Sequence, residues 1–194
     1  FNFLPSDAAM VGNLDLDVID RKNELLKKLN ANNFDLVFLM GQDNLKFNKK
    51  NEFIIYVGSH GDNGAELADI ILPGAAYTEQ SGHYTNLEGK VQKAYKASYP
   101  PGDAKEDWEI INNLAEFMNN RKLFNDKDEL ESSMFNYINL KKEKQESHSN
   151  SKVDFSDFED EILEITYKDY YFSNVIARSS KTMLNCNNSK LEVK

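Results

Sequence analysis

The chain has 194 residues, 40% of them hydrophobic and 11% aromatic, which suffices for the core of one ordinary domain or of a large piece of a longer protein. Its 23 basic and 32 acidic residues give a net charge of −9, which argues against nucleic-acid binding because that requires a basic surface. A mean hydropathy of −0.63 and the lack of a long apolar run argue against membrane insertion. The single cysteine excludes a disulfide framework, an iron–sulfur cluster or a structural zinc site built on this chain alone.

Three short apolar runs predict buried strands of an α/β fold. A helix is expected first, over 20–29, because its leucines share one face. The runs at 34–40, 53–57 and 68–72 follow, each ending at Gly or Pro-Gly. Nearly continuous apolar runs of this length are typical of a parallel sheet that is covered on both faces.

The segment 73–101 is rich in turn residues and contains no element that the pattern predicts. A long irregular stretch inside a compact domain usually binds a ligand or packs between layers. After it, Asp103 is expected to cap a helix, with Glu106 three residues later in the position of a capping box. The core face of this helix is expected to carry Trp108, Ile111, Leu114, Ala115 and Met118.

A second helix is expected over 127–140, followed by a charged, Ser-rich linker over 141–152 that has no apolar residue. The tail, 153–194, combines an acidic amphipathic stretch, an aromatic patch and a final helix around 173–185. Such a short tail buries little surface alone, so we expect it to dock on the domain or on a neighbouring subunit.

The glycine-rich loop from Gly58 to Gly64 is the densest candidate for ligand chemistry. It follows a predicted strand, where α/β proteins place ligand-binding loops, and its three glycines permit backbone N–H groups to hold an anion. The spacing fits neither the dinucleotide nor the P-loop pattern. A tight turn that needs positive φ at glycine is therefore the favoured interpretation.

The remaining chemical candidates are weaker. Metal ligands would come from His60, Asp62, Glu79, His83 and Glu88, but no helical spacing brings them together. Ser59 beside His60 does not by itself imply a hydrogen bond between the two side chains, and Cys186 has no local histidine. The acidic runs are typical of solvated surfaces.

A long central pattern resembles a known family. It runs as HGDNGA at 60–65, ADIILPGAAYTE at 68–79, SG at 81–82, YTNLEGKVQ at 84–92 and PPGDAKEDW at 100–108, with further matches at GNLDL, LMGQD, DYYF and IARSSKTM. These segments resemble, in order, the C-terminal part of the large iron–sulfur subunit of respiratory complex I, of the mitochondrial and alphaproteobacterial type. That subunit is related to molybdopterin-dependent oxidoreductases. The departures from the pattern are His83, Leu87 and Lys90.

The resemblance implies an α/β piece of a molybdopterin-oxidoreductase-like domain with Rossmann-like strands over 1–140, followed by the linker and the tail. It implies a structural, non-catalytic segment of the peripheral arm of proton-translocating NADH:ubiquinone oxidoreductase. The 2Fe–2S and 4Fe–4S clusters would lie in the N-terminal part of the subunit, with no cofactor, metal or molybdenum in this segment. Partners would be that cluster-bearing part and other peripheral-arm subunits.

Packing and turn residues are the site residues that this interpretation implies: Gly61, Asp62, Gly64, Asp69, Pro73, Glu79, Gly82, Asn86, Glu88, Gly89 and Trp108. Among them, Asn86 and Glu88 are expected to bond buried backbone groups of the turn-rich segment. The expected location is the matrix side of the mitochondrial inner membrane, or the cytoplasmic face of a bacterial inner membrane. The alternative is the C-terminal part of a working molybdopterin oxidoreductase, whose turn-rich segment would contact the pterin.

Overall fold

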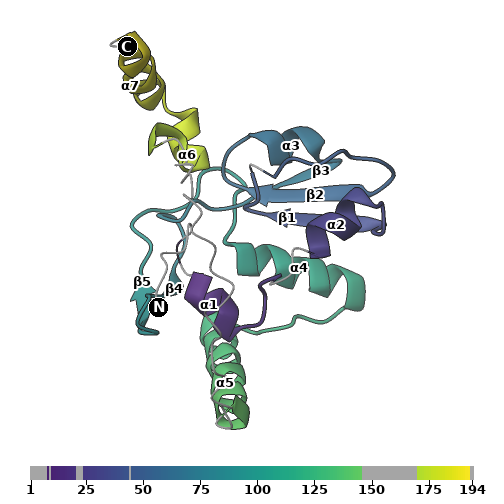
Figure 1. Cartoon of the computed structure of the whole chain (residues 1–194). Coiled ribbons are helices and arrows are strands. Elements are labelled where there is room, and N and C mark those ends of the chain that lie inside the picture. The colour runs from purple at the N-terminus through teal and green to yellow at the C-terminus, as the bar shows by residue number, and fades with distance from the viewer. Residues whose placement is uncertain (1–7, 9, 21–23, 44, 146–169, 193–194) are drawn as a thin grey trace, which may run out of the picture. The chain divides into compact units, whose positions relative to one another are not determined.

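The computed structural model describes residues 8, 10–20, 24–43, 45–145 and 170–192. The chain divides into two compact units, Phe1–Glu143 and Lys144–Lys194 (Figure 1). The first unit begins with α1 (Met10–Asp15), which the sequence did not predict, and α2 (Glu24–Asn30). The predicted helix at 20–29 thus corresponds to α2, and residues 21–23 lie outside the described part of the chain.

A three-stranded parallel sheet forms the centre of the first unit, as the three apolar runs predict. Its strands are β1 (Leu36–Met40), β2 (Phe53–Gly58) and β3 (Ile70–Pro73), in the spatial order β1-β2-β3. Leu36 lies beside Phe53, and Ile55 lies beside Ile70. The predicted α/β class and the three predicted strands are therefore confirmed, with bounds that differ by one or two residues. Their predicted burial on both faces is not found in the described chain, because most residues of β1 and β3 are exposed.

One face of the sheet carries most of the buried core, although Val57 of β2, on the other face, is also only 1% exposed. Ile54 and Tyr56 of β2 and Leu39 of β1 are almost fully buried, and apolar residues of the loop after β1 and of α3 (Asn63–Leu67) pack against them. Successive side chains of a strand point to opposite faces, so these residues share one face. Tyr56 also donates a hydrogen bond from its hydroxyl to the carbonyl of His60 at 3.0 Å, which fixes the loop that follows β2.

The turn-rich segment contains an antiparallel hairpin that the sequence did not predict. β4 (Gly82–Thr85) pairs with β5 (Val91–Ala94) in the register Gly82 to Ala94 and Thr85 to Val91. Gly89 turns the chain with φ +80°, and the N–H of Asn86 bonds the carbonyl of Lys90. This is a three-residue hairpin loop with a glycine in the left-handed region.

α4 (Asp107–Asn119) begins later than predicted. Asp103 does not cap it, because Lys105 forms a parallel bridge with Gly74 that holds the chain extended as far as Glu106. The side chain of Glu106, at the N-cap position, makes no capping bond. The predicted core face of the helix is also wrong at Met118, which is 70% exposed, whereas the polar Asn112 is buried.

α5 (Lys127–Gln145) confirms the second predicted helix and continues into the predicted charged linker. The second unit contains a 3-10 turn at Tyr170–Phe172, α6 (Val175–Ser179) and α7 (Lys181–Glu192), in place of the single helix expected around 173–185. The acidic stretch of the tail and the remainder of the linker lie outside the described residues.

Candidate functional site

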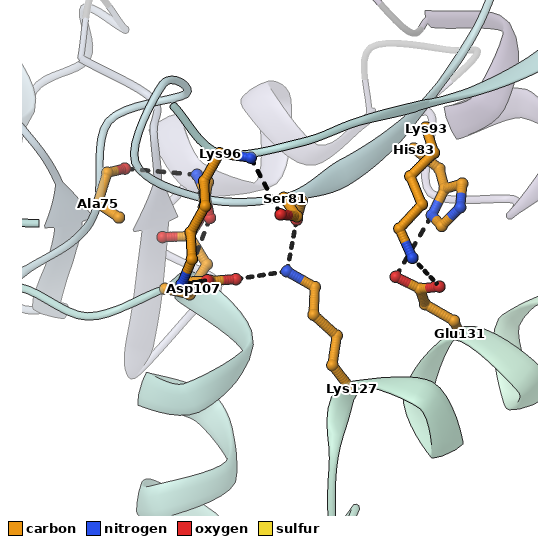
Figure 2. A network of polar contacts seen from close by, with 10 residues as sticks. Ala75, Ser81, His83, Lys93, Lys96, Asp107, Lys127 and Glu131 are labelled. Carbon is orange, nitrogen blue, oxygen red and sulfur yellow. Dashed lines mark hydrogen bonds and ion pairs between the residues drawn. The ribbon is translucent and has the colours of Figure 1, made fainter. Parts of the chain in front are cut away.

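A buried carboxylate joins three parts of the first unit. Glu106, at the start of α4, is 7% exposed and accepts a hydrogen bond from Lys96 at 3.2 Å and a very short one from Lys127. Lys127 also donates to the carbonyl of Ser81 at 2.6 Å (Figure 2). Since Lys96 follows the hairpin and Lys127 begins α5, this cluster fastens the hairpin segment and both long helices to one another. We call Ser81, Lys96, Glu106 and Lys127 the polar junction.

Hydrogen bonds from neighbouring groups extend the polar junction. The Ser81 hydroxyl accepts from the backbone N–H of Lys96 at 3.1 Å. Gln80 donates to the Ala75 carbonyl at 3.3 Å and contacts the Asp107 carboxylate at 3.5 Å. No buried side-chain nitrogen or oxygen among the described residues lacks a partner, so these polar groups are satisfied structurally.

A second cluster ties the hairpin to α5. Glu131 of α5 accepts from Lys93 of β5 at 2.8 Å, and His83 of β4 places Nδ1 3.9 Å from the same carboxylate (Figure 2). The His83 ring meets Phe135 edge-on at 5.1 Å between centroids. The three charged or titratable side chains come from three different elements, and each holds the hairpin against the helix.

Burial and neighbouring charges oppose one another in the junction. Burial raises the pKa of Glu106, but the hydrogen bonds and charges of Lys127 and Lys96 outweigh it and hold that pKa below its ordinary value of 4.5. The pKa of Asp107 is raised, mainly by burial and also by the nearby Glu106, against the lowering effect of the bond from Gln80. The carboxylate of Glu106 is thus stabilised in its charged form by two lysines.

The lowered pKa of Glu106 predicts a pH dependence of stability. The unfolded chain binds this proton more readily than the folded chain, so the stabilisation by Glu106 is present above pH 4.5 and is lost as pH falls through the lower pKa of the folded state. We expect the difference in melting temperature between the natural chain and Glu106→Gln to be constant near neutral pH and to shrink below pH 4.5. The melting temperatures of both chains, read from the loss of soluble chain on heating at several pH values between 7 and 3.5, check this. A difference in melting temperature that does not change with pH would contradict it.

A groove of about 610 Å³ adjoins both clusters. Trp108, Leu130, Met134 and Tyr137 contribute its apolar side chains, and Lys127, Glu131, His83 and Asp107 are among its polar ones. Trp108 also lines a second, apolar cavity of about 190 Å³ between Met40 and the loop after α4. Trp108 was predicted to lie in the core, but its side chain is only half-buried.

Five of the residues singled out in the sequence lie around the ends of β2 and β3. Asp62 caps α3 by accepting from Asn63 N–H at 2.8 Å, and Gly64 is buried against Tyr56. Asp69 accepts from the N–H of the fully buried Ile54 at 2.8 Å and from Lys49 at 2.7 Å. The Lys49 hydrogen bond is the main cause of the lowered pKa of Asp69. The remaining two, Gly61 and Pro73, are exposed.

The glycines of the 58–64 loop do not make the expected turn. None of the three has a positive φ, since the positive values at glycine fall at Gly41, Gly89 and Gly102. Gly58 and Gly64 instead lie against the buried Tyr56 ring, where a side chain would collide, whereas nothing lies within 4 Å of a Cβ placed on Gly61. Close packing, not the turn that we predicted, therefore requires Gly58 and Gly64.

Besides Trp108, the other five lie along the turn-rich segment. Glu79 closes a turn by accepting from the N–H of Ala76 at 2.9 Å, and Gly82 begins β4. Asn86 Oδ1 accepts from the N–H groups of Glu88 and Lys90 at 3.0 and 2.9 Å. These Asn86 bonds are exposed and the side chain of Glu88 is exposed, so the expectation that the two residues satisfy buried backbone groups is wrong. Gly89 supplies the positive φ of the loop. The structure thus spreads the proposed residues over separate turns and strand ends.

Replacing Asn86 with Ala removes both side-chain bonds of the hairpin loop. Because these bonds are exposed, we expect a loss of about 1 kcal/mol in the free energy of unfolding. Asn86→Asp keeps an acceptor at the same position and is expected to lose less than half of that. Melting of the chain, read by its solubility on heating, measures both variants, and an unchanged midpoint in Asn86→Ala would remove the role assigned to this side chain.

The candidate metal ligands do not converge. In the part of the chain that the structure describes, no three side chains of His, Cys, Asp or Glu gather into a possible metal site. Ser59 Oγ and His60 Nδ1 do lie 2.9 Å apart, although adjacency in sequence gave no reason to expect it. This contact lies at the exposed surface, and Cys186 is exposed on α7.

The polar junction does not fit the pterin cofactor that a working molybdopterin oxidoreductase would hold. Such a cofactor is an anion that basic side chains and N–H groups would bind. Here Lys93 is paired with Glu131, and Lys96 and Lys127 share Glu106, while Asp107 adds a further acid beside them. Since the positive charges are already matched, the junction offers no net attraction to an anionic ligand.

Sequence reasoning missed Lys127 and Asn112. Lys127 is separated from Glu106 by 21 positions, and nothing in its local sequence distinguishes it from a solvated lysine. Asn112 accepts from the N–H groups of Leu123 and Phe124 and donates to the Phe124 carbonyl, all within 3.0 Å. The pair Asn112-Asn113 inside an otherwise amphipathic helix was the available signal.

Comparison with known proteins identifies family matches over most of the chain, and they agree with the resemblance drawn from its central pattern. Residues 1–117 match the molybdopterin oxidoreductase family, and residues 129–186 match the C-terminal domain of the G subunit of NADH-ubiquinone oxidoreductase. The chain is 39% identical to the NADH-ubiquinone oxidoreductase 75 kDa subunit of Reclinomonas americana, over 96% of the chain and 28% of that relative. It is 39% identical to the G subunit of NADH-quinone oxidoreductase of Rickettsia bellii, over 100% and 28%.

A fungal relative gives a similar result. The mitochondrial NADH-ubiquinone oxidoreductase 78 kDa subunit of Candida albicans is 36% identical, over 95% of the chain and 27% of the relative. The chain therefore spans little more than a quarter of each relative. Within the described ranges, no helix is long and apolar enough to span a bilayer. The resemblance drawn from the central pattern is confirmed: the chain belongs to the molybdopterin oxidoreductase family and corresponds to a segment of the large subunit of NADH-quinone oxidoreductase.

Proposed function

We propose that the chain is a structural, non-catalytic segment of the peripheral arm of complex I. The observation that carries the proposal is the similarity to large subunits of NADH-quinone and NADH-ubiquinone oxidoreductases over 95–100% of the chain. Electrons pass from NADH to quinone through groups held elsewhere in the complex. This segment supports that transfer by holding the subunit's α/β domain in shape and by offering surfaces to its neighbours.

The geometry of the polar junction supports a structural role. The carboxylate of Glu106 bonds Lys96 and Lys127, and Lys127 also bonds the Ser81 carbonyl. These hydrogen bonds connect the hairpin segment, α4 and α5. A catalytic acid or base would need access to a substrate, and Glu106 is almost buried. The packing and turn residues drawn from the sequence, from Gly61 to Trp108, serve the same purpose in this proposal.

The cofactors follow from the same proposal. The 2Fe–2S and 4Fe–4S clusters belong to the N-terminal part of the large subunit, and this segment carries neither a cluster nor molybdenum. The single cysteine of the chain supports this assignment, as do Glu106 and the neighbouring Asp107, whose two carboxylates together balance the two lysines of the polar junction.

The partners are that cluster-bearing part of the subunit and other peripheral-arm subunits, with neither nucleic acid nor membrane insertion. The net charge of −9 supports the exclusion of nucleic acid. We place the segment on the matrix side of the mitochondrial inner membrane, or on the cytoplasmic face in a bacterium. Relatives named from mitochondria and from Rickettsia support this pair of locations.

The proposed division of the chain remains 1–140 for the α/β piece, 141–152 for the linker and 153–194 for the docking tail. α5 extends through Gln145, so the first residues of the linker are helical. The division into Phe1–Glu143 and Lys144–Lys194 places its boundary in the same region. The family match at 129–186 spans this boundary, so α5 and the tail belong to one family segment in this proposal.

A native gel of solubilised membranes tests the function. We expect this chain to co-migrate with a very large band that oxidises NADH. Migration as a small species away from that band would overturn the proposal. Molybdenum at about one atom per complex in that band would instead favour an active molybdopterin oxidoreductase.

A further inference from the structure

The groove beside the polar junction combines apolar walls with a few polar side chains. Its volume of about 610 Å³ lies within the range of about 300–1,000 Å³ that is typical of small-molecule sites. Trp108 of α4 and Leu130, Met134 and Tyr137 of α5 supply apolar and aromatic walls, and the segment after α1 supplies another. The groove is therefore built from several elements of the first unit and has the size and composition of a ligand site.

Asp107, the first residue of α4, brings a carboxylate to the wall of this groove. Among the described residues, the one hydrogen-bond partner of that carboxylate is Gln80, at the long distance of 3.5 Å. Lys127, which also lines the groove, bonds Glu106 and the Ser81 carbonyl instead. Asp107 thus contributes to the charge balance of the polar junction without forming an ion pair with any residue of the described chain.

The folded chain holds the charge of Asp107 at a cost in stability. Burial and the neighbouring carboxylate of Glu106 raise the pKa of Asp107, which means that the fold disfavours its charged form. Asparagine in its place would keep an acceptor for Gln80 without a half-buried charge. A carboxylate kept in this environment at the wall of a cavity is typical of a binding site, because a bound cation offsets the cost.

The charges around the groove favour a cation over an anion. Asp107 and Glu131 line it as acids and Lys127 lines it as a base, so its wall is net negative while His83 is neutral. The indole and phenol rings of the groove also attract organic cations through their π faces. A metal ion does not fit, because no three His, Cys, Asp or Glu side chains gather among the residues that the structure places.

We propose that this groove binds a small organic cation, whose protonated amine contacts Asp107 and whose apolar body lies against Trp108 and Met134. The site goes beyond the proposed function and does not depend on it. A lysine or arginine side chain of a neighbouring protein carries the same charge, but its thin aliphatic stem would leave most of this volume and its aromatic walls unfilled. The volume therefore favours a small molecule with a bulky apolar body.

Thermal stabilisation of the chain by tryptamine tests the site. Tryptamine carries a protonated amine on an indole body, and tryptophol carries a hydroxyl in place of that amine. The purified assembly that contains the chain is heated in rising concentrations of each compound, and the loss of soluble chain gives the melting midpoint. We expect tryptamine to raise the midpoint by about 3–6 °C at ten times its dissociation constant, and tryptophol to raise it by less than half as much. Equal shifts, or no shift with tryptamine, would overturn the inference.

Variants of the two ends of the groove locate the bound amine. Asp107→Asn removes the charge, and we expect it to melt no lower than the natural chain without ligand and to lose the tryptamine shift. Met134→Trp narrows the apolar part while Asp107 stays in place, and it is expected to lose the shift as well. Glu116→Gln is the matched control, because Glu116 is a half-exposed acid of α4 outside the groove, and the full shift should remain.

The control also excludes a general effect of charge. A full tryptamine shift in Asp107→Asn or in Met134→Trp would place the amine elsewhere and overturn the inference. Loss of the shift in Glu116→Gln would trace the effect to the overall charge of the chain and would overturn it too. None of these results bears on the native-gel test of the proposed function, so the two can fail separately.

Discussion

Replacing Glu106 with glutamine is expected to lower the free energy of unfolding by about 2–3 kcal/mol. The substitution keeps the size of the side chain but leaves Lys127 and Lys96 without their carboxylate. Removal of one partner from a buried ion pair costs about 3–5 kcal/mol, and the partial exposure of both lysines reduces this value. The melting temperature should fall by about 4–12 °C, measured from the solubility of the chain after heating the complex.

Two further variants isolate the charge pair. Glu116→Gln lies on the same helix and breaks an exposed pair with Lys122 at 3.8 Å, so we expect a change of less than about 0.5 kcal/mol. Adding Lys127→Met to Glu106→Gln removes the uncompensated charge and is expected to recover part of the loss. Equal effects of Glu106→Gln and Glu116→Gln would show that the junction contributes no more than a surface pair.

The parallel sheet was predictable because its signal is local. Each strand is a short apolar run that ends at Gly or Pro-Gly, and burial of such a run needs no knowledge of its partner. The hairpin had a local signal as well, in Asn86-Leu87-Glu88-Gly89, which fits a three-residue loop with glycine at the left-handed position. Its strands are four residues long and largely polar, so the apolar pattern does not reveal them.

The polar junction was not predictable from local pattern. The local sequence indicates a helix-capping role for Glu106. The bridge between Gly74 and Lys105 instead keeps its backbone extended, and its side chain bonds lysines that are distant in sequence. Lys96 and Lys127 look like two of many surface lysines. They reach Glu106 only because the hairpin segment and α5 pack beside α4 in the tertiary structure, and a local sequence pattern does not reveal that packing.

Replacing Gly64 with alanine is expected to lower the free energy of unfolding by about 2 kcal/mol. A Cβ at this position would lie 2.5 Å from the carbonyl oxygen of Gln42 and 2.8 Å from the ring of Tyr56. The oxygen belongs to the backbone and Tyr56 is only 1% exposed, so neither group can move away from an added Cβ without a loss of stability. Overpacking of this kind costs about 1–3 kcal/mol or more, which exceeds the gain of up to about 1 kcal/mol in helix propensity within α3.

Gly61→Ala, three residues earlier in the same motif, is the matched control. Nothing lies within 4 Å of its Cβ and its φ is not positive, so we expect no loss of stability and a gain of up to about 1 kcal/mol. Heating of the complex, with solubility of the chain as the readout, compares the two variants directly. If the motif were a ligand cradle that needed all of its glycines, both variants would leave stability intact. A large loss in Gly64→Ala alone follows only if close packing against Tyr56 and Gln42 requires that glycine.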